Sequence, residues 1–161
     1  MGARWAVARH KQGKKAAYIK LTGTAYPKDK NLAYDLGAVA AIDFSRYGYP
    51  STYLRSEIEI LNLYQTLVSD VLSNQPDYVV VEIADGIFQR ETRMLLRNPV
   101  FMSSVHQVVF SAGDSLSAAQ GVQTLNHWGI MPSALSGLFT FDLKFIYGII
   151  IAVLSYLCIT Y

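Results

Sequence analysis

Tyr78-Val-Val-Val-Glu82 is a nearly continuous apolar run that ends in an acid. Apolar runs without polar alternation are typical of strands that are buried on both faces of a parallel sheet. An unpaired carboxylate at the end of such a strand would be costly to bury, so Glu82 requires either a partner or a function. The run therefore predicts an inner parallel strand, and it marks Glu82 as a candidate site residue.

Apolar runs and helical periodicities alternate on both sides of this strand. Strands are expected at residues 16–22, 106–111 and 130–138, a short strand or helix at 36–44, a loop at 23–30, and helices at 4–10, 51–73, 90–97 and 115–128. Strands that alternate with helices in this way are typical of βαβ units. The sequence predicts an α/β domain over residues 1–140, in which helices flank a parallel sheet, followed by an apolar tail over residues 141–161.

The chain is long enough for one domain with a core and too short for two. Its formal net charge is only +2, but residues 1–30 hold eight basic side chains against one acid, Asp29. A basic segment can bind nucleic acid, an anionic membrane surface or phosphates. Because aromatic residues do not alternate with these charges, as base stacking would require, we expect a solvated helix face and no nucleic-acid partner.

The carboxy-terminal segment differs in character from the rest of the chain. Residues 145–161 carry no charge, and their length lies at the lower limit, about 17 residues, for a membrane-spanning helix. We expect an apolar helix that is either a membrane anchor or a buried final element; a third interpretation is sequence foreign to the ancestral domain. Cys158 is the only cysteine, which favours a reducing compartment. The expected location is the cytoplasm, or the cytoplasmic side of a membrane.

Polar residues follow several of the predicted strands. In parallel α/β sheets, ligands bind outside the carboxyl ends of the strands. The residues expected near these ends are Lys20, Thr22 and Thr24 after the first strand, Asp29 and Asp35 in the following segment, Glu82, and Ser136 and Gly137 after the last strand. Carboxylate oxygens hold Mg²⁺ and a lysine ammonium neutralises phosphate charge, so these residue types predict a phosphate–metal site.

Each of these residues also has an ordinary structural interpretation. Glu82 could cap a loop or pair with Arg90 or Arg93, and Lys20 could simply be exposed at its strand end. Asp29 and Asp35 lie in a segment expected to be a polar loop, where Asp is common in turns, and only one of them is expected to bind a metal. The three histidines have no shared spacing and no cysteine near them, so no zinc site is predicted.

Three segments together resemble a known family. These are Ala17-Tyr-Ile-Lys-Leu-Thr-Gly-Thr24, then Asp35, then Val79-Val-Val-Glu-Ile-Ala-Asp-Gly86, which look like the dethiobiotin synthetase-like group of P-loop NTPases. The P-loop half of uncharacterised two-domain proteins, which follows a Rossmann-like half, looks closer still. The resemblance covers the element order of residues 5–140. It implies the P-loop fold, ATP and Mg²⁺ as cofactors, and phosphoryl transfer to a small substrate.

The resemblance also implies roles for individual residues. Lys20 would contact the phosphate and the substrate, with Thr22 and Thr24 beside it, and Lys20 and Glu82 would be the catalytic residues. Asp29 or Asp35 would join Glu82 in the metal shell, and Ser136-Gly137 occupies the place of the nucleotide-base loop.

One part of the family pattern is missing. A phosphate loop has the form Gly-x-x-x-x-Gly-Lys-Ser/Thr, and Gly13-Lys14-Lys15 does not fit it, because position 8 is Ala and position 15 is Lys. In the family the first strand and this loop precede the helix expected at Arg4, so we expect a chain truncated before them, with impaired ATP-dependent activity. The alternative is a non-catalytic remnant, anchored in a membrane or acting through partners. A sheet edge left by a missing strand would favour pairing with another chain, including a second copy.

Overall fold

The computed structural model describes residues 13–84, 86–137 and 156–160. The chain divides into two compact units, residues 1–106 with 157–161 and residues 107–156. Both units contain parallel strands with helices packed on them, so the predicted α/β class, a parallel sheet flanked by helices, is confirmed.

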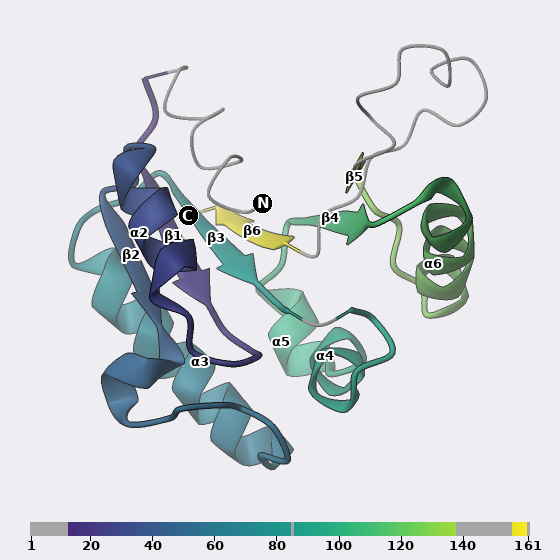
Figure 1. Cartoon of the computed structure of the whole chain (residues 1–161), viewed down its shortest axis with the longest axis horizontal. Helices are drawn as coiled ribbons and strands as arrows, with labels where there is room; N and C mark the ends of the chain where they lie inside the picture. The colour runs from purple at the N-terminus through teal and green to yellow at the C-terminus, as the bar shows by residue number, and fades with distance from the viewer. Residues whose placement is uncertain (1–12, 85, 138–155, 161) are drawn as a thin grey trace. The chain divides into compact units, whose positions relative to one another are not determined.

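The first unit is built on three parallel strands (Figure 1). Strand β1 (Ala16–Lys20) lies between β2 (Ala40–Asp43) and β3 (Tyr78–Glu82). All residues of β1 and β2 are buried, as are the three valines of β3. The valine run therefore forms a buried parallel strand as predicted, and the expected segment at residues 36–44 contains a strand.

Helices α2 (Pro27–Asp35) and α3 (Glu57–Leu72) pack against β1 and β2. The chain crosses from β1 to β2 through α2 and returns past β1 to β3 through α3. Parallel crossovers are right-handed, and these two run in opposite directions across the sheet. The helices α2 and α3 therefore lie on opposite faces, as Figure 1 also shows. This arrangement buries the central strand on both sides and leaves its carboxyl end at an open edge.

Two boundaries differ from the sequence prediction. Residues 27–35 form helix α2 instead of continuing a loop, because Pro27 occupies the first helical turn, where its missing N–H costs nothing. Helix α3 begins at Glu57 instead of Ser51. Ser56 and Glu59 form a reciprocal capping box there, a strong helix start, whereas Ser51 pairs with Thr24 in an isolated bridge.

The first unit is completed by short helices. A 3-10 turn η1 (Phe44–Tyr47) follows β2, and helices α4 (Arg90–Leu96) and α5 (Pro99–Ser103) follow β3. Helix α4 matches its prediction, whereas α5 was not predicted. Tyr64 of α3 packs edge-to-face on Phe101 of α5, with 4.8 Å between ring centres, and its hydroxyl lies 2.8 Å from that of Ser104.

The second unit contains β4 (Gln107–Ala112), α6 (Ser115–His127) and β5 (Ala134–Gly137). The two strands are parallel, and Ser111 is aligned with Ser136. Asp114 caps α6 by accepting a hydrogen bond from the Ser117 amide at 2.8 Å. Gly121 of α6 is buried against the ring of Phe110 of β4. These elements agree with the strand–helix–strand order predicted for this stretch.

Most of the apolar tail, and the helix expected at residues 4–10, lie outside the described residues. Residues 156–160 form strand β6 (Tyr156–Thr160), so the helix expected for the tail is wrong at these positions. Among the helices of the described ranges, none is long and apolar enough to cross a membrane. The sequence at 156–160 is rich in β-branched and aromatic residues, which favour strands, and apolar character alone does not distinguish the two structures.

Candidate functional site

Three charged residues stand side by side at the carboxyl edge of the first unit's sheet. Lys20 ends β1 and is in register with Asp43, which ends β2, and with Glu82, which ends β3. The carboxyl ends of parallel strands are where ligands bind in α/β folds. The sequence singled out Lys20 and Glu82 but missed Asp43, although the same signal, an acid after a small apolar strand, is present there.

Lys20 is buried, with 6% of its surface exposed, so the expectation of simple exposure at a strand end is wrong. Its Nζ donates to Asp29 Oδ2 at 2.5 Å. Asp29 reaches it because α2 starts soon after β1 and carries Asp29 in its first turn. A buried ammonium group requires such a partner. The structure therefore brings together two of the residues that the sequence analysis selected.

Asp43 is almost completely buried and is held by three donors. Its Oδ1 accepts hydrogen bonds from the Ser45 amide at 3.0 Å and from the Ser45 hydroxyl, and its Oδ2 lies 3.0 Å from Lys30 Nζ. Burial raises the pKa of Asp43, but the Ser45 hydrogen bonds and the Lys30 ammonium outweigh it, and the pKa lies below the usual value. Asp43 is therefore a fixed anion at neutral pH.

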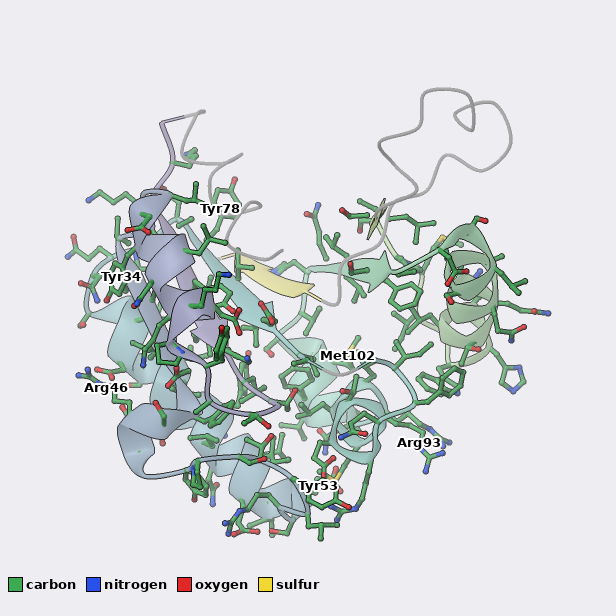
Figure 2. All side chains as sticks on the ribbon, viewed as in Figure 1. Tyr34, Arg46, Tyr53, Tyr78, Arg93 and Met102 are labelled. Atoms are coloured by element: carbon green, nitrogen blue, oxygen red, sulfur yellow. The ribbon has the colours of Figure 1, made fainter. Side chains whose placement is uncertain are left out.

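Glu82 is half-buried and accepts a hydrogen bond from Tyr18, whose hydroxyl lies 2.6 Å from Oε2. Its other oxygen, Oε1, makes no hydrogen bond within the described part of the chain. The suggested ion pair with Arg90 is wrong, because Arg90 pairs with Glu91. Figure 2 shows the exposed Arg93 side chain extending outward from α4. Glu82 thus keeps one carboxylate oxygen for a further contact.

The segments that follow β1 and β3 are joined by hydrogen bonds. Leu21 donates its amide to the Glu82 carbonyl at 2.8 Å, which extends the strand pairing by one residue. Thr22 Oγ1 then accepts from the Ala84 amide at 2.9 Å, and Thr92 donates to the Ala84 carbonyl at 3.1 Å. These bonds fix the backbone just beyond the charged strand ends, so Thr22 has a positioning role in this structure.

A small cavity of about 150 Å³ lies next to these segments. Its lining residues are polar for the most part: Thr22, Gly23, Thr24, Ser51, Thr52, Tyr53, Ala84, Gln89 and Glu91. Gly23 has a φ of +109°, which a residue with a side chain would rarely adopt. It exchanges hydrogen bonds with Thr52, donating to its Oγ1 at 2.9 Å and accepting from its amide at 3.0 Å. Tyr53, labelled in Figure 2, belongs to the same loop.

Glu91 is a cavity residue that the sequence analysis treated as an ordinary first-turn acid. It is 2% exposed, and its Oε1 accepts from the Leu54 amide at 2.9 Å and from Arg90 Nη1 at 2.8 Å. The charged turn Gln89-Arg-Glu-Thr92 gave no signal of burial, because the loop that covers Glu91 comes from residues about 37 positions earlier. Its environment is created by tertiary structure alone.

The three carboxylates that the sequence proposed for a metal are not gathered into one cluster. Asp29 pairs with Lys20, and Asp35 is exposed at the last position of α2. Within residues 13–84, 86–137 and 156–160, no three acids, histidines or cysteines form a metal-binding group. Mg²⁺ is often bound by one or two carboxylates together with phosphates and water. Glu82, with Oε1 unbonded, fits that mode, whereas an all-protein cage does not fit.

Ser136 and Gly137 are the last residues of β5 in the second unit, aligned with Ser111 and Ala112 at the end of β4. They occupy a strand end, as predicted. Their proposed role beside a nucleotide base stays a prediction.

Comparisons with known proteins add no functional assignment. The chain was compared with protein-family models, with curated proteins and with solved structures, and none of the three gave a match. Its function is therefore inferred from the side chains and their contacts.

Proposed function

We propose that the first unit binds a nucleotide phosphate together with Mg²⁺ at the carboxyl edge of β2, β1 and β3, as in the P-loop-type domains that the sequence resembles. The observation that carries this proposal is the register of Lys20 with Glu82 on adjacent strands. One cation and one carboxylate at the same sheet edge are the pair that a phosphate and its metal require.

Each residue has a distinct role in this proposal. The Lys20 ammonium binds a phosphate oxygen, and Asp29, 2.5 Å away, holds it in position before the ligand arrives. Glu82 holds Mg²⁺ through Oε1, while Tyr18 fixes the carboxylate through Oε2. The bound metal supplies neutralisation of phosphate charge. Of the two aspartates expected near Glu82, Asp29 is favoured over Asp35 as the second acid of the site, because Asp29 contacts Lys20 and Asp35 lies at the far end of α2.

The proposed activity is limited by the missing phosphate loop. Walker-type loops surround the phosphates with backbone N–H groups and supply a second lysine. The sequence contains no Gly-x-x-x-x-Gly-Lys-Ser/Thr motif, so this chain by itself would bind the nucleotide weakly and transfer its phosphoryl group slowly. Binding is therefore the property to measure first, and turnover is secondary.

A second candidate is a non-catalytic interaction protein in which the charged edge is purely structural. The observation that favours it is that the charged groups at this edge already have partners: Lys20 with Asp29, Lys30 with Asp43, and Glu82 with Tyr18. Buried ion pairs of this kind can specify a fold without binding a ligand. In that case no nucleotide would bind to Lys20 or Glu82 in place of these partners.

Calorimetric titration of MgATP into the full-length chain separates the two candidates. We expect measurable binding that is lost in Lys20→Gln, since the phosphate then loses its cation. Lys28→Gln is the matched control, because Lys28 is an exposed lysine on the same helix that carries Asp29. If the folded wild-type chain produces no binding heat with millimolar MgATP, the nucleotide proposal is overturned.

A further inference from the structure

The cavity beside the charged edge contains an acid that the proposed function does not use. Glu91 is 2% exposed, and both of its described hydrogen bonds end on Oε1. Its Oε2 takes no hydrogen bond from the described residues. Within the described residues, every fully buried side-chain oxygen has a hydrogen-bond partner. Oε2 has none, so it is not fully buried. Glu91 lines the cavity, and Oε2 is the carboxylate oxygen that its described hydrogen bonds leave open.

The orientation of Glu91 is fixed from two sides. Leu54 adopts a φ of +60°, a conformation that residues with a side chain rarely take, and its amide donates to Glu91 Oε1. Arg90 Nη1 contacts the same oxygen and also donates to the Arg55 carbonyl at 3.1 Å. Backbone strain at a binding loop often reflects pre-organisation of a site. Here the Leu54 amide and Arg90 hold one carboxylate oxygen and leave the other without a hydrogen bond from the described residues.

Three hydroxyl groups of the cavity, those of Thr22, Ser51 and Thr52, already contact backbone groups. A hydroxyl has one proton and two acceptor positions. The Ser51 and Thr52 hydroxyls donate to the Gly23 carbonyl at 3.2 and 3.5 Å, and Thr22 donates to the Ala84 carbonyl at 3.4 Å. Each also accepts one backbone N–H, from Tyr53, Gly23 and Ala84 respectively. Each of these three hydroxyls keeps one acceptor position, which adds to the lone pairs of Glu91 Oε2, while Thr24, Tyr53 and Gln89 add groups that can donate or accept.

The charge of the lining selects the same kind of ligand. Among the described residues that line the cavity, Glu91 carries the one carboxylate, and none is a lysine or an arginine. A phosphate or carboxylate would therefore meet the like charge of Glu91, whereas a cation would be attracted by it. Arg90 already compensates part of the Glu91 charge, so a divalent ion would leave a larger excess of positive charge in the cavity than a monovalent one. A monovalent cation suits both the charge and the lone pairs.

We propose that this cavity is a binding site for a small monovalent cation, held by Glu91 Oε2 and by the hydroxyl oxygens of Thr22, Ser51 and Thr52. Potassium binds through such oxygens, and an ammonium group has only donors to offer them. The cation is either an inorganic ion or the ammonium group of a small amine. This site uses residues other than Lys20 and Glu82, so it does not depend on nucleotide binding. Thr22 then belongs to the cation site and not to the phosphate site.

Thermal unfolding of the full-length chain at constant ionic strength, without nucleotide or Mg²⁺, tests this site. Choline chloride is the reference salt, because choline carries a charge but no N–H donor. We expect Tm to rise when choline is replaced by potassium, ammonium or methylammonium, since a ligand that binds the native state stabilises it. A rise with potassium and ammonium alike identifies an inorganic cation, whereas a rise confined to methylammonium identifies an amine.

Glu91→Gln should weaken binding of the cation by about tenfold or more, because a charge-assisted contact is lost. The affinity is judged from the concentration dependence of Tm. If that variant does not fold, Ser51→Ala removes one hydroxyl and should also reduce the shift. Lys28→Gln, at an exposed position that does not line the cavity, should leave the shift unchanged. Equal Tm values of the wild type in choline, potassium, ammonium and methylammonium would overturn the proposal. So would a shift that persists unchanged in a folded Glu91→Gln chain or, failing that, in Ser51→Ala.

Discussion

The pair formed by Lys20 and Asp29 should respond very differently to removal of one partner or the other. Removing one partner of a buried ion pair costs about 3–5 kcal/mol, because the remaining charge stays uncompensated. Asp29→Ala leaves the ammonium of Lys20, whose side chain is 8% exposed, so a loss of about 3 kcal/mol in the free energy of unfolding is expected. Lys20→Met leaves Asp29, whose side chain is 36% exposed, so water compensates it and the loss should be about 1 kcal/mol.

The double variant distinguishes this explanation from simple loss of packing. With both charges removed, no unpaired ammonium remains, so Lys20→Met in the Asp29→Ala background should restore stability. Urea unfolding of the wild type, the two single variants and the double variant gives the coupling free energy directly. Lys28→Met, at an exposed position of α2, controls for loss of a lysine. Additive losses, or a larger loss for Lys20→Met than for Asp29→Ala, would refute the reasoning.

Two further predictions concern other parts of the chain. A Cβ added at Gly121 would lie 2.0 Å from Phe110 Cε1, so Gly121→Ala should cost about 1–3 kcal/mol. Phe110→Leu should reduce that cost in urea unfolding, and an equal cost in both backgrounds would contradict the packing seen here. The pKa of Asp43 is lowered in the native state from a reference of 3.8, so its contribution is present above that pH and is lost as pH falls through the native pKa. The stability gap between wild type and Asp43→Asn should therefore narrow below about pH 4; a gap independent of pH would disprove it.

Local patterns predicted the elements whose burial leaves a direct mark on the sequence. The valines of β3 predicted a buried strand, and the apolar spacing after Ser115 predicted α6. The start of α3 was missed because Ser51 and Ser56 both resemble N-caps, although Glu59, three residues after Ser56, completes a capping box that distinguishes them. Pro27 does not by itself distinguish a loop from a helix start, because proline is common in turns and also at the first position of helices.

The candidate site was predictable only where a charge follows an apolar strand. That signal found Lys20 and Glu82, and it applies equally to Asp43, which was overlooked. The pairing of Lys20 with Asp29 depends on the first turn of α2, so it could not be derived while that segment was assigned to a loop. Glu91 could not be found from its neighbours in sequence, because the Leu54 amide that contacts it comes from a distant loop.

The metal dependence of ATP binding tests the central claim, that Lys20 and Glu82 form a phosphate–metal edge, most directly. ATP is titrated into the full-length chain by calorimetry, with and without Mg²⁺, for the wild type and for Glu82→Gln. The proposal predicts that Mg²⁺ tightens ATP binding to the wild type, and that Glu82→Gln loses this gain while keeping the metal-free affinity. Absence of ATP binding to the folded wild type, or an equal gain from Mg²⁺ in both chains, would contradict it.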